Sequence, residues 1–156
     1  LQKGKAFGAE IGTDKLRKVE DVLGGQSKDV IRGSKGMNVL DGYTGKDKLY
    51  GKGGKDFFKF STELGKNNVD TVKDFKPKAD TFLLDHSVFD GLAIGNLTRK
   101  EFRIGKRAKD KNDHIIYDSA SHKLLFDPNG SQKGGEQAFA IVGDGVKLTF
   151  HDFIVI

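Results

Sequence analysis

The stretch from Gly24 to Phe60, GGQSKDVIRGSKGMNVLDGYTGKDKLYGKGGKDFFKF, decides the fold of this chain. Four columns of residues recur in it at a spacing of nine residues. The columns are Gly24, Gly33, Gly42 and Gly51; Gly36, Gly45 and Gly54, with Ser27 in the first repeat; Asp29, Asn38, Asp47 and Asp56; and Ile31, Leu40, Leu49 and Phe58. One such column carries little weight in a chain with 21 glycines, but four columns in phase indicate a structural repeat.

A nine-residue unit divides into a six-residue turn and a three-residue strand. The glycines let the backbone turn tightly, and the Asp or Asn closes the turn with a side-chain oxygen. The apolar residue two positions later points inside, because neighbours on a strand alternate faces. Two units make one coil, so equivalent turns lie eighteen residues apart. The repeat predicts an all-β fold: a parallel β-roll with a β-rich capping region at its C-terminal end.

Stacking of the coils places Asp29 beside Asp47 along one edge of the roll, and Asn38 beside Asp56 along the other. Stacked carboxylates repel each other unless a cation lies between them. Two side-chain oxygens and several turn carbonyls supply the six or so oxygen ligands that Ca²⁺ takes. A second interpretation stays open here, because Asp and Gly also form good turns without any metal.

The nonapeptide G-x-x-G-x-[DN]-x-U-x, where U is a large apolar residue, is identified as the RTX, or haemolysin-type, calcium-binding repeat. The segments Asp56–Asp85 and Asp113–Ser131 resemble the regions after the repeats in serralysin-type metalloproteases and related exoproteins of type I secretion. The chain ends in HDFIVI, which resembles the C-terminal signal of substrates of ABC-type (type I) secretion systems: Asp152, Phe153, Ile154, Val155 and Ile156. The resemblance extends from about Lys18 to the end.

The resemblance implies which oxygens would hold the calcium ions. In RTX rolls the earlier turn contributes the carbonyls of its second and fourth positions and its Asp, and the turn one coil later those of its first and third positions and its Asp. One site would then use Gly25, Ser27 and Asp29 with Gly42, Thr44 and Asp47; a second would use Ser34, Gly36 and Asn38 with Gly51, Gly53 and Asp56; further sites would pair Asp47 or Asp56 with Asp70 and Asp74. Asn38 lacks a charge, so we expect the second site to be weaker.

Composition bears on the rest. The chain has 156 residues and no cysteine, so bound calcium would have to replace the disulfides of small secreted proteins. No apolar run is long enough to span a bilayer, and no N-terminal signal peptide is recognisable. The first residue is Leu1 rather than Met, from which we expect a fragment or a processed product with a passenger domain upstream.

The net charge of +5 is unusual for a calcium-binding repeat. The excess lysines occupy variable repeat positions: Lys28, Lys35, Lys46, Lys48, Lys52, Lys55 and Lys59. They form either a solvated surface or a basic face for an anionic polymer such as a polysaccharide. No aromatic-flanked nucleic-acid motif accompanies them. An alternative function is therefore a basic β-solenoid adhesin or polysaccharide-binding module with weak or no calcium dependence.

Three zones are predicted: a lead-in with a degenerate repeat over 1–23, in which Asp14–Leu23 forms an edge strand, the roll over 24–60, and a cap with the secretion signal over 61–156. Strands are expected in the cap at Val69–Phe75, Thr81–Leu84, His114–Tyr117, Lys123–Phe126, Gln137–Val142 and Phe153–Ile156, with a hairpin turn at Ser119–His122 and single helical turns at Ser87–Leu92 and Thr98–Phe102.

No catalytic constellation can be assembled from the sequence: H-E-x-x-H, G-x-S-x-G, P-loop and Rossmann motifs do not occur. The stretch around Asp127, Asn129 and Gly130 reads as a hairpin turn or a further calcium loop. The predicted function is a non-catalytic, secreted bacterial module. It would pass a type I apparatus unfolded and fold outside the cell on Ca²⁺.

Overall fold

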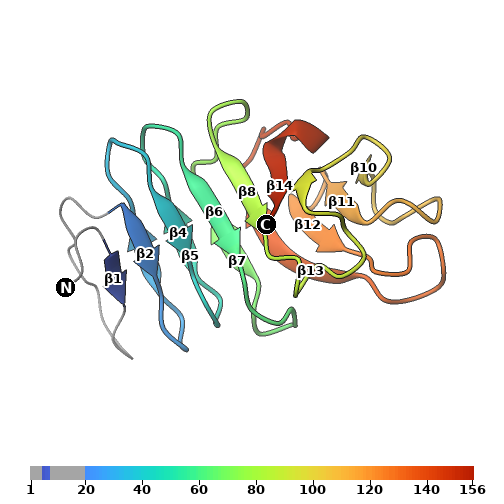
Figure 1. Ribbon diagram of the computed structural model, residues 1–156, viewed down its shortest axis with the longest axis horizontal. Coiled ribbons are helices and arrows are strands. Elements are labelled where there is room, and N and C mark those ends of the chain that lie inside the picture. The colour runs from blue at the N-terminus through green and yellow to red at the C-terminus, as the bar shows by residue number, and fades with distance from the viewer. Residues whose placement is uncertain (1–4, 8–19) are drawn as a thin grey trace.

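A computed structural model describes residues 5–7 and 20–156 of the chain. It is an all-β structure of two seven-stranded sheets that face each other (Figure 1). The strands are β1 (Lys5–Phe7), β2 (Asp21–Leu23), β3 (Val30–Arg32), β4 (Val39–Asp41), β5 (Lys48–Tyr50), β6 (Phe57–Phe60), β7 (Asp70–Val72), β8 (Thr81–Leu84), β9 (Gly95–Asn96), β10 (Phe102–Ile104), β11 (Ile115–Asp118), β12 (Lys123–Phe126), β13 (Gln137–Val142) and β14 (Phe153–Val155), with a short 3-10 helix η1 (Phe150–Asp152) before β14.

The chain from β2 to β8 winds alternately through the two sheets. One sheet has the order β1-β2-β4-β6-β8-β14-β9, and the other has the order β10-β11-β12-β13-β7-β5-β3. Within the repeats, β2, β4 and β6 pair in parallel with an offset of eighteen residues, as do β3 and β5. This is the predicted parallel β-roll, and the all-β fold class is confirmed.

The core consists of two ladders of inward-pointing side chains, one from each sheet. Their members are register partners on adjacent strands and are all buried: Val22, Leu40, Phe58, Phe82 and Phe153 on one sheet, and Ile31, Leu49, Val72 and Val142 on the other. The repeat places one apolar residue per strand at the same height in each coil. Stacking the coils therefore joins these residues into a continuous hydrophobic column.

Coiling continues beyond the repeats. β7 pairs in parallel with β5 and β8 with β6, but the offsets are 23 and 24 residues because the intervening turns are longer. The roll therefore extends through Leu84, past residue 60 where the nine-residue period ends. The division into zones 1–23, 24–60 and 61–156 stays a prediction about domains.

The C-terminal residues complete the roll. After β8 the chain forms β9 to β12, and then β13 returns beside β7 and β14 beside β8, both in parallel. β14 lies between β8 and β9, with Phe153 and Val155 buried. In Figure 1 the red C-terminal strand lies against β8 in the middle of the molecule, not at its end.

The strand predictions over Thr81–Leu84, Lys123–Phe126 and Gln137–Val142 are confirmed, and β7, β11 and β14 differ from their predictions by one to three residues at the ends. The hairpin turn between β11 and β12 is confirmed by their antiparallel pairing, and single turns occur at both expected helical positions.

One expectation is wrong: β2 is not an edge strand, because β1 pairs with it. The remainder of Asp14–Leu23, from 14 to 19, lies outside the described residues, and β1, β9 and β10 were not predicted. Within the described part of the chain, no helix has both the length and the apolar character needed to cross a membrane.

Candidate metal centre

Three turns of the roll are closed by the side-chain oxygen of their own Asp or Asn. Asp29 Oδ2 accepts a hydrogen bond of 2.7 Å from the backbone N–H of Gly25, four residues earlier. Asn38 Oδ1 does the same with Ser34 N–H at 2.6 Å, and Asp80 Oδ2 with Lys76 N–H at 2.8 Å. This local bond satisfies a turn amide and aims the carboxylate into the edge of the roll.

The same side chains also link successive coils. Asp47 Oδ1 accepts the N–H of Asp29 at 2.7 Å, and Asp70 Oδ1 accepts the N–H of Asp47 at 3.0 Å. On the opposite edge, Asp56 and Asp80 accept in the same manner from the residue one coil earlier, Asn38 and Asp56 respectively, each at 3.0 Å. Two columns of stacked side-chain oxygens result, and the predicted neighbours Asp29 and Asp47, and Asn38 and Asp56, do lie together.

The pair of Asp47 and Asp70 is the most constrained part of these columns. Asp47 is fully buried and Asp70 is 4% exposed, and among the described residues Asp47 Oδ2 is a buried oxygen without a hydrogen-bond partner. Oδ2 of each residue lies close to the point that a Cβ on Gly42 would occupy. Two ionised carboxylates only accept hydrogen bonds, so this pair needs a shared proton or a cation to coexist.

Burial and mutual repulsion appear in the pKa values of this pair. Desolvation, with the charge of Asp29 nearby, raises the pKa of Asp47 to about 6. Desolvation and the charges of Asp47 and Asp41 raise the pKa of Asp70 to about 7. The metal-free edge therefore holds protons more tightly than free aspartate does, which marks a site where a cation would relieve unfavourable charge.

The other edge carries a milder version of the same arrangement. Desolvation, followed by the charge of Asp80, raises the pKa of Asp56 to about 6. Its neighbour on the repeat side is the uncharged Asn38, which is also buried. Besides the neighbours predicted within the repeats, each edge thus has a carboxylate from the following coil. Asp70 lies next to Asp47, as one of the predicted further sites has it, and Asp80 follows Asp56.

Backbone carbonyls lie beside these carboxylates. A Cβ atom on Gly45 would lie 2.8 Å from Ser27 O and 2.9 Å from Asp47 Oδ1, so these two predicted ligand oxygens face the same point. A Cβ atom on Gly33 would lie 2.9 Å from Gly51 O. Since only glycine leaves this space open, the glycine columns keep a cradle between successive turns.

Two of the predicted carbonyl ligands are engaged in hydrogen bonds between coils. Gly25 O accepts the N–H of Thr44, and Ser34 O accepts the N–H of Gly53, each at 3.3 Å. These bonds are long, and a carbonyl oxygen has a second lone pair for a ligand. Another predicted carbonyl, that of Gly36, lies 2.6 Å from the point that a Cβ on Gly54 would occupy.

Asp74 belongs to neither column of stacked side chains. Its two oxygens accept the N–H groups of Gly51 and Lys52, at 2.8 and 2.9 Å. The residue that follows Asp56 in the column is Asp80, which sequence reasoning missed. The signal that could have found it is the triplet Asp80-Thr81-Phe82, which repeats the spacing of carboxylate and buried apolar residue after the nine-residue period has ended.

Tyr43 and Lys52 stand where this type of repeat has its second glycine, and both adopt left-handed backbone angles, with φ of 65° and 70°. That conformation favours glycine, so both turns carry local strain. Asp127, in the stretch read as a turn or a calcium loop, accepts the N–H of Asn129 at 3.2 Å, which is a turn-closing contact.

The donor set fits calcium. Within residues 5–7 and 20–156, no group of three His, Cys, Asp or Glu side chains converges on one point, so a metal here would need backbone carbonyls. Two carboxylates and several carbonyls, all oxygen, are the ligands that Ca²⁺ prefers, whereas zinc sites use His and Cys. The ligand assignments to particular atoms remain predictions.

Comparison with protein families supports this conclusion. Residues 23–58, about a quarter of the chain, match the RTX calcium-binding nonapeptide repeat, in four copies. A comparison with curated proteins found no match. Repeats of this type bind Ca²⁺ and are generally non-catalytic. The turns that carry Asp29, Asn38, Asp47 and Asp56 thus lie in the matched segment, and residues 23–58 are an array of RTX calcium-binding nonapeptide repeats.

Proposed function

We propose that this chain is the calcium-gated folding module of an exported protein. At low calcium the charge on the two edges disfavours the roll, and at high calcium the roll forms. Extracellular calcium modules bind with dissociation constants near ~10⁻⁴ to 10⁻³ M, far above the free calcium level of a cytosol. The module would therefore stay unfolded inside the cell and fold outside it.

The observation that carries the proposal is the buried pair of Asp47 and Asp70. Asp47 Oδ2 is buried without a partner, and the pKa values of both carboxyl groups are raised. Bound calcium supplies the positive charge that lets both carboxylates ionise together. Because the unfolded chain has no such pair, the free energy of calcium binding becomes free energy of folding.

The position of the C-terminal residues supports a link between folding and export. Asp152 and Phe153 are 3% and 0% exposed, and β14 is hydrogen-bonded on both sides. The buried part of the segment Asp152–Ile156, which comprises Asp152, Phe153 and Val155, would be accessible to an export apparatus only while the roll is unfolded. Folding inside the cell would hide the signal, and folding outside it would complete the last coil.

The resemblance of Asp56–Asp85 and Asp113–Ser131 to serralysin-type exoproteins favours the type I apparatus as the route. In this proposal the protein is secreted, its role is non-catalytic, and the folded roll stabilises a passenger domain joined to it.

A calcium titration followed by far-UV circular dichroism tests the folding step. The chain is first stripped of metal, and Mg²⁺ serves as the control ion. We expect a cooperative gain of β-structure with Ca²⁺ alone. Replacing Asp47 by Ala should weaken this response by about an order of magnitude or more in calcium concentration, because a ligand in the middle of its column is lost.

Asp90→Ala is the matched control, since Asp90 is an exposed carboxylate outside the roll turns. A spectrum that is already complete without calcium, in wild type and both variants, would show that the turns hold without metal. The export step is tested separately by co-expression with a type I apparatus. If removal of residues 152–156 leaves export unchanged, the signal lies elsewhere.

A further inference from the structure

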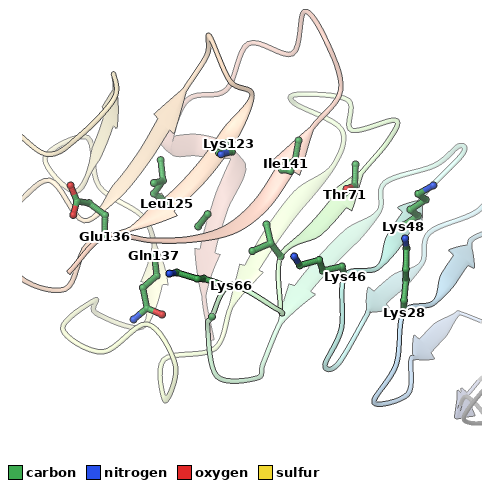
Figure 2. Close-up of a pocket in the computed structure, with 13 residues that line it drawn as sticks. Lys28, Lys46, Lys48, Lys66, Thr71, Lys123, Leu125, Glu136, Gln137 and Ile141 are labelled. Atoms are coloured by element: carbon green, nitrogen blue, oxygen red, sulfur yellow. The ribbon is translucent and has the colours of Figure 1, made fainter. Parts of the chain in front are cut away.

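The outer face of the second sheet carries a groove that calcium binding does not account for. It has a volume of about 880 Å³. Its walls come from the repeats and from the C-terminal region together: Lys28, Lys46, Lys48, Gly65, Lys66, Val69, Thr71, Lys123, Leu125, Glu136, Gln137, Ala138 and Ile141. Figure 2 shows these side chains on the face of the sheet, with lysines from distant parts of the chain around its centre.

The register of the sheet explains how the lysines come together. Lys48, Thr71, Ile141 and Lys123 are successive cross-strand partners on β5, β7, β13 and β12, so they form one row across the sheet. Lys28, Lys46 and Lys66 lie along the neighbouring turns. At ~4.8 Å per strand, the row from β5 to β12 spans about 14 Å.

The groove has an excess of unpaired positive charge. Its five lysines are exposed, and Glu136 is the one acidic residue among its lining residues. Within the described part of the chain, no carboxylate lies at ion-pair distance from any of these lysines. Five ammonium groups around one groove repel each other and attract an anion with several charges.

We propose that this groove binds a linear anionic polysaccharide of the polyuronate type, lying across the strands. Its carboxylates would meet the lysines, and the apolar floor of Val69, Leu125 and Ile141 would pack against the C–H faces of the sugar rings. Thr71 and Gln137 offer hydrogen-bonding groups for the hydroxyls.

Two other polyanions fit less well. Single-stranded nucleic acid is held by a basic groove combined with aromatic side chains on which its bases stack, and no aromatic side chain or arginine is among the residues that line this groove. Acidic peptide motifs are typically recognised by arginine clusters, which this groove lacks, and extended peptides commonly bind by adding a strand to a sheet edge. Strands β5, β7, β13 and β12 have partners on both sides, so their backbone groups are already paired.

The test uses the calcium-loaded full chain and an oligogalacturonate long enough to span the groove, with a neutral oligosaccharide of equal length as control. Binding is measured by calorimetry at low and at physiological salt. We expect binding of the acidic oligomer alone, weakened by salt because the lysines are exposed. Absence of binding at low salt would overturn the proposal.

Two variants with the same change in net charge locate the site. The first, Lys46→Glu with Lys48→Glu and Lys123→Glu, reverses charge inside the groove. The second, Lys35→Glu with Lys55→Glu and Lys100→Glu, reverses three exposed lysines outside it. Each variant changes one lysine directly before a turn aspartate, Lys46 before Asp47 in the first and Lys55 before Asp56 in the second. Comparing the two variants therefore also controls for effects on the calcium turns.

We expect the groove variant to lose about tenfold or more in affinity and the control variant about twofold. Equal losses in both would mean attraction by net charge alone and would overturn the assignment. Equal or tighter binding of single-stranded DNA or polyaspartate to the groove would overturn the choice of polysaccharide. Circular dichroism in calcium checks that each variant is folded. If a triple variant does not fold, the single change Lys123→Glu on β12, far from the calcium turns, replaces it in the binding measurement.

Discussion

Raising the pH should destabilise the metal-free roll, and this follows from the pair of Asp47 and Asp70. The pKa values of the two groups rise from 3.8 to about 6 and about 7 on folding. Between 3.8 and these values the folded chain holds protons that the unfolded chain has released. Stability is therefore greatest at low pH in this window and is lost as the pH rises through the folded pKa values.

The size of the effect can be worked from the same shifts. One pKa unit corresponds to ~1.4 kcal/mol, so Asp47 alone loses about 1–2 kcal/mol of stabilisation between pH 5 and 7.5. Asp70 adds to this, but less than independently because the two groups share their charge. We expect a loss of roughly 2–3 kcal/mol for the pair, or about 5–10 °C in Tm.

The assay is thermal unfolding by far-UV circular dichroism at pH 5 and 7.5. Buffers are passed through a chelating resin, because soluble chelators bind calcium poorly in acid. Asp47→Asn is the matched variant: it keeps the shape of the side chain and removes one charge of the pair. All other ionisable groups are common to wild type and variant, so the difference between the two isolates the carboxylate pair.

We expect Asp47→Asn to flatten the pH dependence of the metal-free chain. Added calcium should reverse the wild-type slope, since calcium binds the ionised carboxylates and competes with protons. If the metal-free wild type is as stable at pH 7.5 as at pH 5, or if the variant keeps the full slope, the argument from buried repulsion is wrong.

Three further predictions concern single residues. Asn38→Asp places a second carboxylate beside Asp56: calorimetry should show tighter calcium binding by about tenfold, while metal-free chemical unfolding should show a less stable roll. Gly42→Ala should cost about 1–3 kcal/mol and weaken the calcium response, because its Cβ would lie 2.8 Å from Asp70 Oδ2; Gly65→Ala, with no atom within 4 Å, should behave as wild type in the same titration. Phe82→Ala should cost about 3–5 kcal/mol in urea unfolding, because the fully buried ring lies between Phe58 and Phe153 in the core ladder, with Phe82→Leu retaining most of that stability.

The roll within the repeats was predictable because its register equals its period. Leu40 and Phe58 stand eighteen residues apart in the sequence, and they are cross-strand partners in the structure. The adjacency of Asp29 and Asp47 follows from the same number. Because the strand offset equals two sequence periods, residues of one repeat column become cross-strand neighbours in the structure.

The remainder of the roll was not predictable in this way. The column continues through Asp80 after a turn that is six residues longer, so the period no longer points to it. The last coil joins β13 to β7 and β14 to β8, with about seventy residues between the partners. No local pattern encodes such a parallel pairing, since its register depends on the chain that lies between.

The short strands β9 and β10 escaped prediction for another reason. They have two and three residues, with half-exposed or exposed side chains, so neither shows the alternation of a half-buried strand. They exist because longer neighbours, β14 and β11, offer them backbone partners. Their structure is a property of the sheet, not of their own sequence.

A basic net charge is compatible with the proposed calcium sites because the positive and negative charges lie in different places. The carboxylates of Asp47, Asp56 and Asp70 are buried inside the edges, whereas Lys46 and Lys48 are exposed beside them. The net charge therefore describes the outer surface and not the metal centre. Since Lys46 and Asp47 belong to one turn, ordering that turn by calcium would also set one wall of the groove. Calcium and a polyanion would then each strengthen the binding of the other by the same factor, because such coupling is reciprocal.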